Sequence, residues 1–322
     1  MKKKLWTNIL RVAISVGGLA YVFLTNDWRQ ILAELGQADW RYLLGALLIY
    51  VLSLVVRAFR WFVLVRKLAP NVAFGRLLRL YFVGQFFSTF LPSIYGGDVI
   101  RAVELTQDTD TSAAIGTVLL DRLTGLMMLA LMGLVVLPFQ ATRMEPWLAW
   151  TMLAVMMAVL VGGTLLIEGR LLRWLTGRLP SRLSLAGQGT LARIYAAITG
   201  CGWRAVVAAF GVSVVFNLMN VGINWMCGLA VEMGISLAHF FVISSLFSIA
   251  GMIPSIGGWG VRETLSTIIF ESVSNEKAAA WGVALNLIAL AAGLVGGVVY
   301  AAEGVLGLRE TRPTEPDMAE SP

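Results

Sequence analysis

The sequence predicts an all-α polytopic membrane protein, and its composition and segment lengths both support that prediction. Of the 322 residues, 58% are hydrophobic and only 14% are charged. A water-soluble domain of this length needs about 25% charged residues to cover its surface. Several largely apolar runs also reach the ~20 residues that a helix needs to cross the hydrocarbon core of a bilayer. A soluble globular protein is therefore excluded.

Eight apolar segments follow one another along the chain. They cover residues 5–24, 42–66, 74–107, 112–139, 147–167, 204–231, 236–270 and 278–305. Six of them are unbroken and predict about six full transmembrane helices. The basic start from Met1 to Lys4 resembles a signal peptide, but no small-residue cleavage site follows the first segment. We therefore expect that segment to remain as an uncleaved helix.

The other two segments, 74–107 and 236–270, are interrupted by Pro, Ser and a Gly pair. The interruptions read PSIYGGDVIR, ending at Arg101, and PSIGGWGVR, ending at Arg262. The two strings agree at Pro, Ser, Ile, Gly, Gly and Arg after one gap, and turn chemistry does not demand the Arg. We interpret them as products of an internal duplication; convergent use of common helix breakers is the alternative. Each interruption predicts a broken, re-entrant helical hairpin.

The distribution of basic residues predicts the orientation of the chain. If both broken segments enter and leave on one side, the N-terminus, residues 57–79, residues 168–204 and the C-terminal tail all face the cytoplasm, as the positive-inside rule requires. If the broken segments crossed fully, the Arg-rich stretch 168–204 would lie opposite the basic N-terminus. The first model is preferred, and in it the two hairpins enter from opposite faces. This is an inverted repeat, the architecture of many alternating-access transporters.

The predicted domains follow from this symmetry. Residues 1–140 form the first membrane repeat, with its re-entrant motif at residues 90–104, and residues 141–307 form the second, with its motif at residues 252–263. Residues 308–322 are rich in Pro and charge and are expected to form a disordered cytoplasmic tail. Both termini are therefore expected on the cytoplasmic side.

The two interruptions supply most of the candidate substrate-binding residues. They are Pro92, Ser93, Gly96, Gly97, Asp98, Arg101 and Glu104 in the first motif, and Pro254, Ser255, Gly257, Gly258, Arg262 and Glu263 in the second. A Gly pair before a half-helix leaves free N–H groups at a positive helix end, and an Arg one turn later adds a planar fork of donors. This combination suits a phosphate group. The alternative is that Arg101 only neutralises Asp98 or Glu104, and that Arg262 only neutralises Glu263.

The Gly pairs also predict positions that tolerate no side chain. Close backbone approach is expected at Gly97 and Gly258, whereas Gly293 lies in an unbroken segment and is expected to be an ordinary position.

Polar residues in the unbroken segments complete the candidate set. Arg57 and Arg60 lie three residues apart on one helical face and either line a path or extend their charged groups to the cytoplasmic headgroups. Asn217, Asn220 and Asn224 share one face of segment 204–231. Because an Asn stripe in lipid is costly, this face must point into the bundle, where it either joins helices or lines a cavity.

One further charged pair lies inside an otherwise apolar segment. Asp121 and Arg122 each cost ~2.5–3.5 kcal/mol at membrane depth even on insertion scales, so both are expected in the bundle interior. A structural ion pair is the preferred interpretation for Asp121, and Arg122 is included among the binding candidates.

The composition excludes several kinds of chemistry. One His and two Cys do not supply a structural zinc site or a disulfide framework. No Gly-rich phosphate loop follows a strand. We expect no metal or other cofactor. The net charge of +6 is assigned to cytoplasmic loops rather than to nucleic-acid binding.

The motifs resemble the flippase-like transmembrane region of lysylphosphatidylglycerol synthases. The matching residues are Phe90–Arg101, Leu120–Gly125 and Ile253–Glu263, and the resemblance covers nearly the whole chain. It implies that an aminoacylated or otherwise modified phospholipid moves from the inner to the outer leaflet of a bacterial inner (cytoplasmic) membrane. The chain departs from the bifunctional members, because no soluble aminoacyl-transferase domain follows residue 305. It is therefore not expected to synthesise the lipid itself.

Three functional hypotheses follow. The first is a flippase, not an enzyme, that moves a phospholipid or modified phospholipid between leaflets and binds anionic or phosphate-bearing headgroups. The second is an integral-membrane enzyme acting on a lipid-linked substrate, which needs a general base; Asp98 is the candidate. The third is an accessory subunit that presents lipid to another enzyme. A homo-oligomer and a partner lipid-modifying enzyme are both compatible with the sequence.

Overall fold

The computed structural model describes residues 28–90, 96–140, 145–169, 173, 174, 176, 185, 189–250, 261–270 and 273–305. Every regular element within these residues is an α-helix, as predicted. The helices are α2 (Trp28–Gln37), α3 (Trp40–Val65), α4 (Phe74–Phe90), α5 (Gly96–Leu105), α6 (Thr111–Gln140), α7 (Pro146–Glu168), α9 (Thr190–Gly200), α10 (Trp203–Ala230), α11 (Leu237–Ala250), α12 (Val261–Ile269) and α13 (Asn275–Val305).

Five of the described helices are long and apolar enough to cross a membrane: α3, α6, α7, α10 and α13. Within them, much of each helix surface carries exposed aliphatic and aromatic side chains, as a lipid-facing surface requires. The sixth crossing expected from the sequence, at residues 5–24, lies outside the described residues. The protein is thus an all-α polytopic membrane protein, while the total number of crossings stays a prediction.

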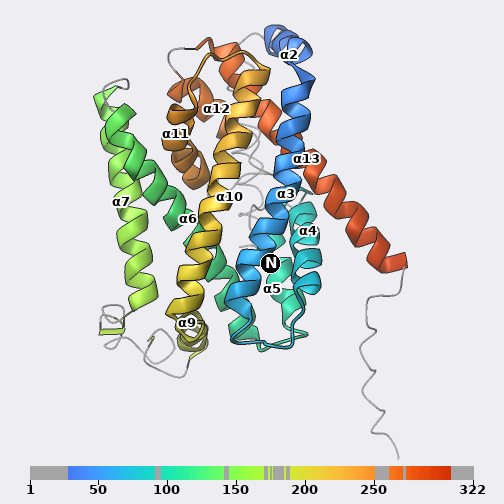
Figure 1. Ribbon diagram of the computed structural model, residues 1–322, viewed down its shortest axis with the longest axis vertical. Helices are drawn as coiled ribbons and strands as arrows, with labels where there is room; N and C mark the ends of the chain where they lie inside the picture. The colour runs from blue at the N-terminus through green and yellow to red at the C-terminus, as the bar shows by residue number, and fades with distance from the viewer. Residues whose placement is uncertain are drawn as a thin grey trace, which may run out of the picture.

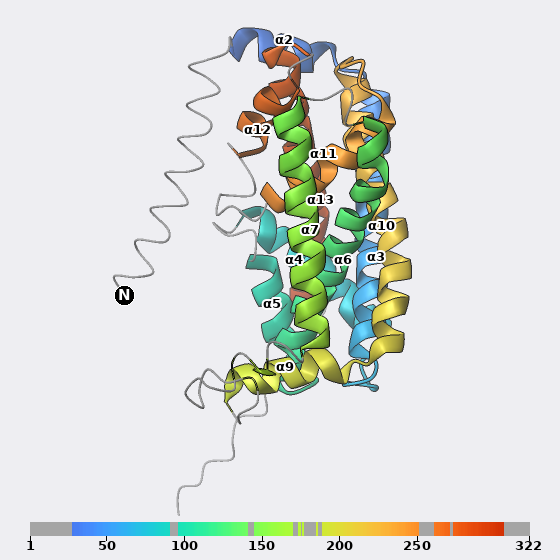
Figure 2. The same cartoon turned by 90° about the vertical axis from the view of Figure 1, so that its left-hand side faces the viewer.

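Short helices lie across both ends of the bundle. Figure 2 shows α2 across the upper end and α9 across the lower end, each roughly perpendicular to the long helices. On α2, Ile31 is buried whereas Trp28 and Leu32 are exposed. A short helix with an apolar face and a polar face suits the interface between headgroups and acyl chains.

The two interrupted segments form helix pairs at opposite ends of the bundle. In Figure 1, α4 and α5 occupy the lower half, and α11 and α12 occupy the upper half. The chain enters α4 from the lower end and returns there after α5, whereas it enters α11 from the upper end and returns there after α12. This arrangement agrees with the two oppositely oriented hairpins that the sequence predicts.

The contacts between helices also have the symmetry of an inverted repeat. The helix α4 packs against α13, the last span of the second half, and α11 packs against α6, the last span of the first half. The second spans of the two halves, α3 and α10, pack along each other. Exchanging α3 with α10, α4 with α11 and α6 with α13 preserves these contacts. The boundaries of the two repeats stay predictions.

The contact between α4 and α13 corrects one expectation about glycine. A Cβ at Gly293 would lie 2.6 Å from Oγ1 of Thr89, and one at Gly296 would overlap the carbonyl oxygen of Phe82. Small residues on α13 therefore let the two helices approach closely, as small residues do in membrane helix pairs. Gly293 is therefore not an unconstrained position, although a Cβ there would meet a side chain, whereas one at Gly97 would meet the backbone of Gly84; that Gly293→Val is milder than Gly97→Val stays a prediction.

The arrangement predicts opposite accessibility for two loops. Asn71, in the α3–α4 connection at the lower end, and Ser236, before α11 at the upper end, are both exposed. Single Cys substitutions there, in a background without Cys201 and Cys227, should react with a membrane-impermeant maleimide from opposite sides of intact vesicles. Even if they were retained, the two native thiols would add little labelling, because both are buried and burial raises the pKa of Cys201 to about 11.

The control for this measurement is labelling after the vesicles are made permeable, which should reach both positions. Labelling of both positions from the same side in intact vesicles would contradict the arrangement of the two hairpins. The positions first suggested by the motifs, Tyr95 and Trp259, lie outside the described residues.

Candidate functional site

Charged side chains from three helices meet inside the bundle at the level of the α4–α5 hairpin. We call this cluster the charged network. Its members are Arg60 on α3, Asp98 and Arg101 on α5, and Asp121 and Arg122 on α6. All five are linked in a continuous series of ion pairs, in which each Asp lies between two Arg side chains.

Asp121 is the centre of the charged network and is completely buried. One carboxylate oxygen, Oδ1, accepts from Nε of Arg60 at 2.7 Å. The other oxygen, Oδ2, accepts from the hydroxyl of Tyr81 at 2.5 Å and from Nη1 of Arg101 at 3.4 Å. Three donors on three other helices thus compensate a carboxylate that would be costly to bury alone. The predicted ion pair at Asp121 is confirmed, with Arg60 and Arg101 as its partners.

In the first motif, Arg101 pairs with acids, which is the alternative to phosphate binding. Its side chain is only 4% exposed, and its guanidinium pairs with both Asp98 and Asp121. The guanidinium carbon also lies 4.0 Å from the ring centre of Tyr81 and 4.9 Å from that of Trp61. Acids and rings therefore enclose the group that the sequence assigned to a phosphate.

Glu104 does not take part in this pairing. Its carboxylate lies 3.5 Å from Nη2 of Arg76, near the start of α4, and Arg76 also bonds Asp108 at 3.4 Å. The suggestion that Glu104 neutralises Arg101 is therefore wrong. Arg101 pairs with Asp98 in the first turn of α5, whereas Glu104, in the last turn, meets Arg76 of α4.

The start of α5 is held against α4 by a close backbone approach. Gly96 and Gly97 are both buried, and the N–H of Gly97 donates to Oγ of Ser88 at 3.2 Å. Asp98 follows in the first turn, where a carboxylate is favoured by the positive helix end. The Gly pair thus places Asp98 between the guanidinium groups of Arg101 and Arg122.

Arg60 joins the charged network to the second half of the chain. It is 3% exposed, and its Nη1 donates to Oγ of Ser213 on α10 at 3.2 Å. A Cβ at Gly125 would overlap the same guanidinium group, so this glycine on α6 makes room for it. The alternative that Arg60 extends to the headgroups is therefore wrong.

Arg57, one turn earlier on α3, has different surroundings. Its guanidinium carbon lies 5.2 Å from the ring centre of Phe216, and 5.7 Å from those of Tyr50 and Tyr81. Its Nε is buried and has no hydrogen-bond partner in the part of the chain that the structure describes. Among the described residues, no carboxylate forms an ion pair with Arg57.

The Asn stripe on α10 points into the bundle, as predicted. Asn217 is completely buried and donates to the carbonyl oxygen of Gly125 on α6 at 3.2 Å, while its own Oδ1 has no hydrogen-bond partner among the described residues. Asn224 is 8% exposed and donates to the carbonyl oxygen of Asn220. The carbonyl of Asn224 in turn accepts from the Trp281 ring nitrogen on α13 at 2.8 Å. The side chain of Asn217 thus joins α10 to α6, which is one of the two roles expected for the stripe, whereas the side chain of Asn224 bonds within α10.

Part of the candidate set lies where the structure gives no description. Pro92, Ser93, Pro254, Ser255, Gly257 and Gly258 fall outside the described residues. Arg262 and Glu263 lie at the start of α12, and only their backbone is described. Their assignment to a binding site stays a prediction.

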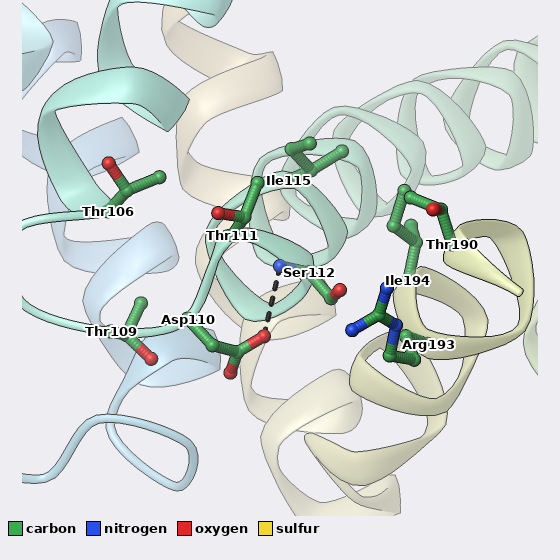
Figure 3. A pocket seen from close by; sticks show the side chains of 9 residues that line it. All are labelled: Thr106, Thr109, Asp110, Thr111, Ser112, Ile115, Thr190, Arg193 and Ile194. Carbon is green, nitrogen blue, oxygen red and sulfur yellow. Dashed lines mark hydrogen bonds between the residues drawn. The ribbon is translucent and has the colours of Figure 1, made fainter. Parts of the chain in front are cut away.

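A separate polar cavity of about 460 Å³ opens at the lower end, between the α5–α6 connection and α9 (Figure 3). Its lining residues are Thr106, Thr109, Asp110, Thr111, Ser112, Ile115, Thr190, Arg193 and Ile194. Asp110 is already engaged, because its Oδ2 accepts from the N–H groups of Ser112 and Ala113 and so caps α6. None of these residues stands out in the sequence as a binding candidate, since scattered hydroxyl groups carry no distinctive signal.

The described residues contain no group of three or more His, Cys, Asp and Glu that could hold a metal ion.

The fold and the site together define a multi-pass helical membrane protein with buried charges at membrane depth, a combination that occurs where polar groups serve a function within the bilayer. The model of the lysylphosphatidylglycerol synthase TM region matches residues 8–297, and the chain belongs to this family. No individual curated protein matches the chain. The family and the apolar helices fit a lipid-related membrane function.

Proposed function

We propose that the protein is a lipid translocator, which moves a phospholipid or modified phospholipid between the leaflets of a bacterial inner membrane. The observation that supports this proposal is the charge of the buried site. The charged network contains three Arg and two Asp, and Arg57 lies one turn from it with no acid paired to it among the described residues. A net positive region inside the bundle suits a headgroup that carries a phosphate.

The position of this charge is as informative as its sign. A phospholipid headgroup that crosses the bilayer must leave water, which costs free energy. This desolvation cost is lower where protein dipoles and charges take the place of the solvent. Arg side chains at membrane depth are expensive, so a protein that needs none for transport or for catalysis rarely contains two buried ones, Arg60 and Arg101, with two partly exposed ones, Arg57 and Arg122, beside them. The network therefore supports a path for a polar group.

The two hairpins support a mechanism in which this path opens to each leaflet in turn. Each hairpin enters from one end of the bundle and packs against the last span of the other half. In inverted-repeat transporters, a site between the two halves is exposed alternately to each side. Such a mechanism needs no soluble domain.

The enzyme hypothesis is less well supported by the geometry. Asp98, its candidate general base, faces the guanidinium groups of Arg101 and Arg122 with its two oxygens. A base must have a free oxygen within hydrogen-bond reach of the proton that it removes. Both oxygens of Asp98 are engaged in ion pairs.

Reconstitution in liposomes tests the proposal. The purified protein, incorporated into vesicles with a fluorescent phospholipid in both leaflets, should expose the inner-leaflet fluorophore to an impermeant reductant faster than protein-free vesicles do. A panel of zwitterionic, anionic and aminoacylated headgroups would show which lipid moves fastest. Vesicles containing an unrelated helical membrane protein are the control. No acceleration with any phospholipid would contradict the proposal, and a chemically altered lipid would favour an enzyme.

A further inference from the structure

Arg57 is the charged side chain near the network whose charge the described residues leave unbalanced. The neighbouring Arg60, on the same face of α3, bonds Asp121 and Ser213. Arg57 has three aromatic rings around it instead and forms no ion pair with the described residues. The two Arg side chains thus differ in their surroundings although they lie one turn apart.

The rings orient the guanidinium group and leave its edge for another ligand. A guanidinium attracted to ring faces gains electrostatic stabilisation from the rings, but its N–H donors lie in its own plane and stay unsatisfied. The Nε of Arg57 illustrates this, because it is buried and has no acceptor. A buried donor without a partner is unfavourable, so the site is complete only when an acceptor arrives.

The depth of Arg57 argues against simple contact with the headgroup region. It lies eight residues before the end of α3 at Val65, which corresponds to roughly 12 Å along the helix axis. Two of its rings, Tyr81 and Phe216, come from α4 and α10, so the guanidinium lies between helices of both halves. A snorkelling side chain would instead extend toward the helix end.

Tyr81 connects this site to the charged network. Its ring faces Arg57 at 5.7 Å and Arg101 at 4.0 Å, while its hydroxyl donates to Asp121. An anion bound by Arg57 would therefore lie next to a region with one excess positive charge. We propose that Arg57, within the cage of Tyr50, Tyr81 and Phe216, binds the phosphate group of the lipid during translocation. This inference deepens the proposed function and rests on it for the expected effect on lipid translocation.

Arg57→Gln tests the site, and Arg193→Gln is the matched control because Arg193 is an exposed Arg in the lower cavity. Phosphatidylglycerol added to detergent-solubilised protein should raise the Tm of the unchanged protein and of Arg193→Gln, but not that of Arg57→Gln. Arg57→Lys should bind the lipid about tenfold to a hundredfold more weakly, since Lys lacks the bidentate fork. Diacylglycerol, which has no phosphate, should shift none of the variants.

Further Tm measurements distinguish a lipid phosphate from free phosphate as the ligand, and a loss of binding from a loss of folding. Inorganic phosphate that shifts the Tm as strongly as the lipid would identify a free phosphate as the ligand of the same site. Arg57→Gln should have the Tm of the unchanged protein in the absence of lipid, because no acid loses a partner. An undiminished lipid shift in Arg57→Gln, or an equal shift with diacylglycerol, would overturn the inference.

The transport measurement separates this inference from the proposed function. If the unchanged protein translocates lipid and Arg57→Gln does so at the same rate, the anion site is wrong and the translocator stands. If phosphatidylglycerol binds through Arg57 but no vesicle shows translocation, the anion site stands and the translocator is wrong. The expected result is a loss of at least about tenfold in the translocation rate of Arg57→Gln.

Discussion

Replacement of Asp121 by Asn is expected to lower the free energy of unfolding by about 3–5 kcal/mol. The substitution keeps the size of the side chain and removes its charge. Arg60 and Arg101 would then have only Asp98 as an acid within the network, and Arg60 would have none in contact. A buried charge that loses its partner is among the costliest changes in a protein interior. The measurement is denaturation in mixed micelles, followed by circular dichroism.

An exposed ion pair provides the control for this prediction. Asp108 pairs with Arg76 at 3.4 Å, and its side chain is 32% exposed. Asp108→Asn should therefore cost no more than about 1 kcal/mol, because exposed pairs contribute little in a polar solvent. Equal losses for Asp108→Asn and Asp121→Asn would show that the charged network is not a buried, low-dielectric site.

The double substitution Arg60→Gln with Asp121→Asn distinguishes loss of a pair from loss of packing. Removing Arg60 as well leaves Arg101 with its remaining partner, Asp98, and removes the isolated guanidinium. The double variant should recover part of the stability that Asp121→Asn loses. The interaction free energy from the four proteins is expected to lie in the range of 0.5–3 kcal/mol reported for groups in contact. Additive effects would mean that the two side chains do not interact.

The sequence predicts the spans well, because hydropathy and length are local properties. The segment 278–305 is described as α13, and the interruption in 74–107 separates α4 from α5. In the sequence, Pro92 and Ser93 fall between α4 and α5, and Gly96 and Gly97 begin α5, so this pattern of helix-breaking residues is readable without knowing the fold. The second interruption falls between the end of α11 at Ala250 and the start of α12 at Val261.

The contacts within the charged network could not be predicted from the sequence. Asp121 is recognisable as a buried acid because charge is rare in an apolar segment, but its partner Arg60 lies 61 residues away. Nothing local marks Tyr81 as the third donor, since a tyrosine in a hydrophobic helix is ordinary. The partner of Arg101 was expected among its nearest acids, and packing against α6 adds Asp121. These assignments require the tertiary arrangement.

Arg57 and Arg60 make the same point in a different way. Spacing places both on one face of a helix and predicts a common role. Helix packing separates them, because α6 supplies an acid at the level of Arg60, whereas α4 and α10 supply rings at the level of Arg57. The expected effects on stability therefore differ. Neutralising Asp121, the partner of Arg60, should cause a large loss of stability, whereas neutralising Arg57 should cause little change.

Gly97→Val is expected to disrupt the α4–α5 hairpin. A Cβ at Gly97 would overlap the carbonyl oxygen of Gly84 and the hydroxyl of Ser88, and would lie 2.7 Å from the carbonyl carbon of Gly84. Two of these atoms belong to the backbone of α4, so no rotamer change relieves the overlap and the two helices must separate. Overpacking of this kind costs about 1–3 kcal/mol and occasionally more. Separation would also displace Asp98 and Arg101, which follow on the same helix.

Gly222→Val on α10 is the control, because a Cβ there has no neighbour within 4 Å. Its Tm should change little, since Val is at least as compatible with a helix interior as Gly. Gly97→Val should lower the Tm and also slow lipid translocation in the fraction that remains folded, because the charged network is carried by the displaced helix. Thermal unfolding and translocation are to be measured on the same preparations. If Gly97→Val keeps both the Tm and the translocation rate of Gly222→Val, the close approach of α4 and α5 does not exist in the membrane, and the placement of Asp98 and Arg101 within the charged network is refuted with it.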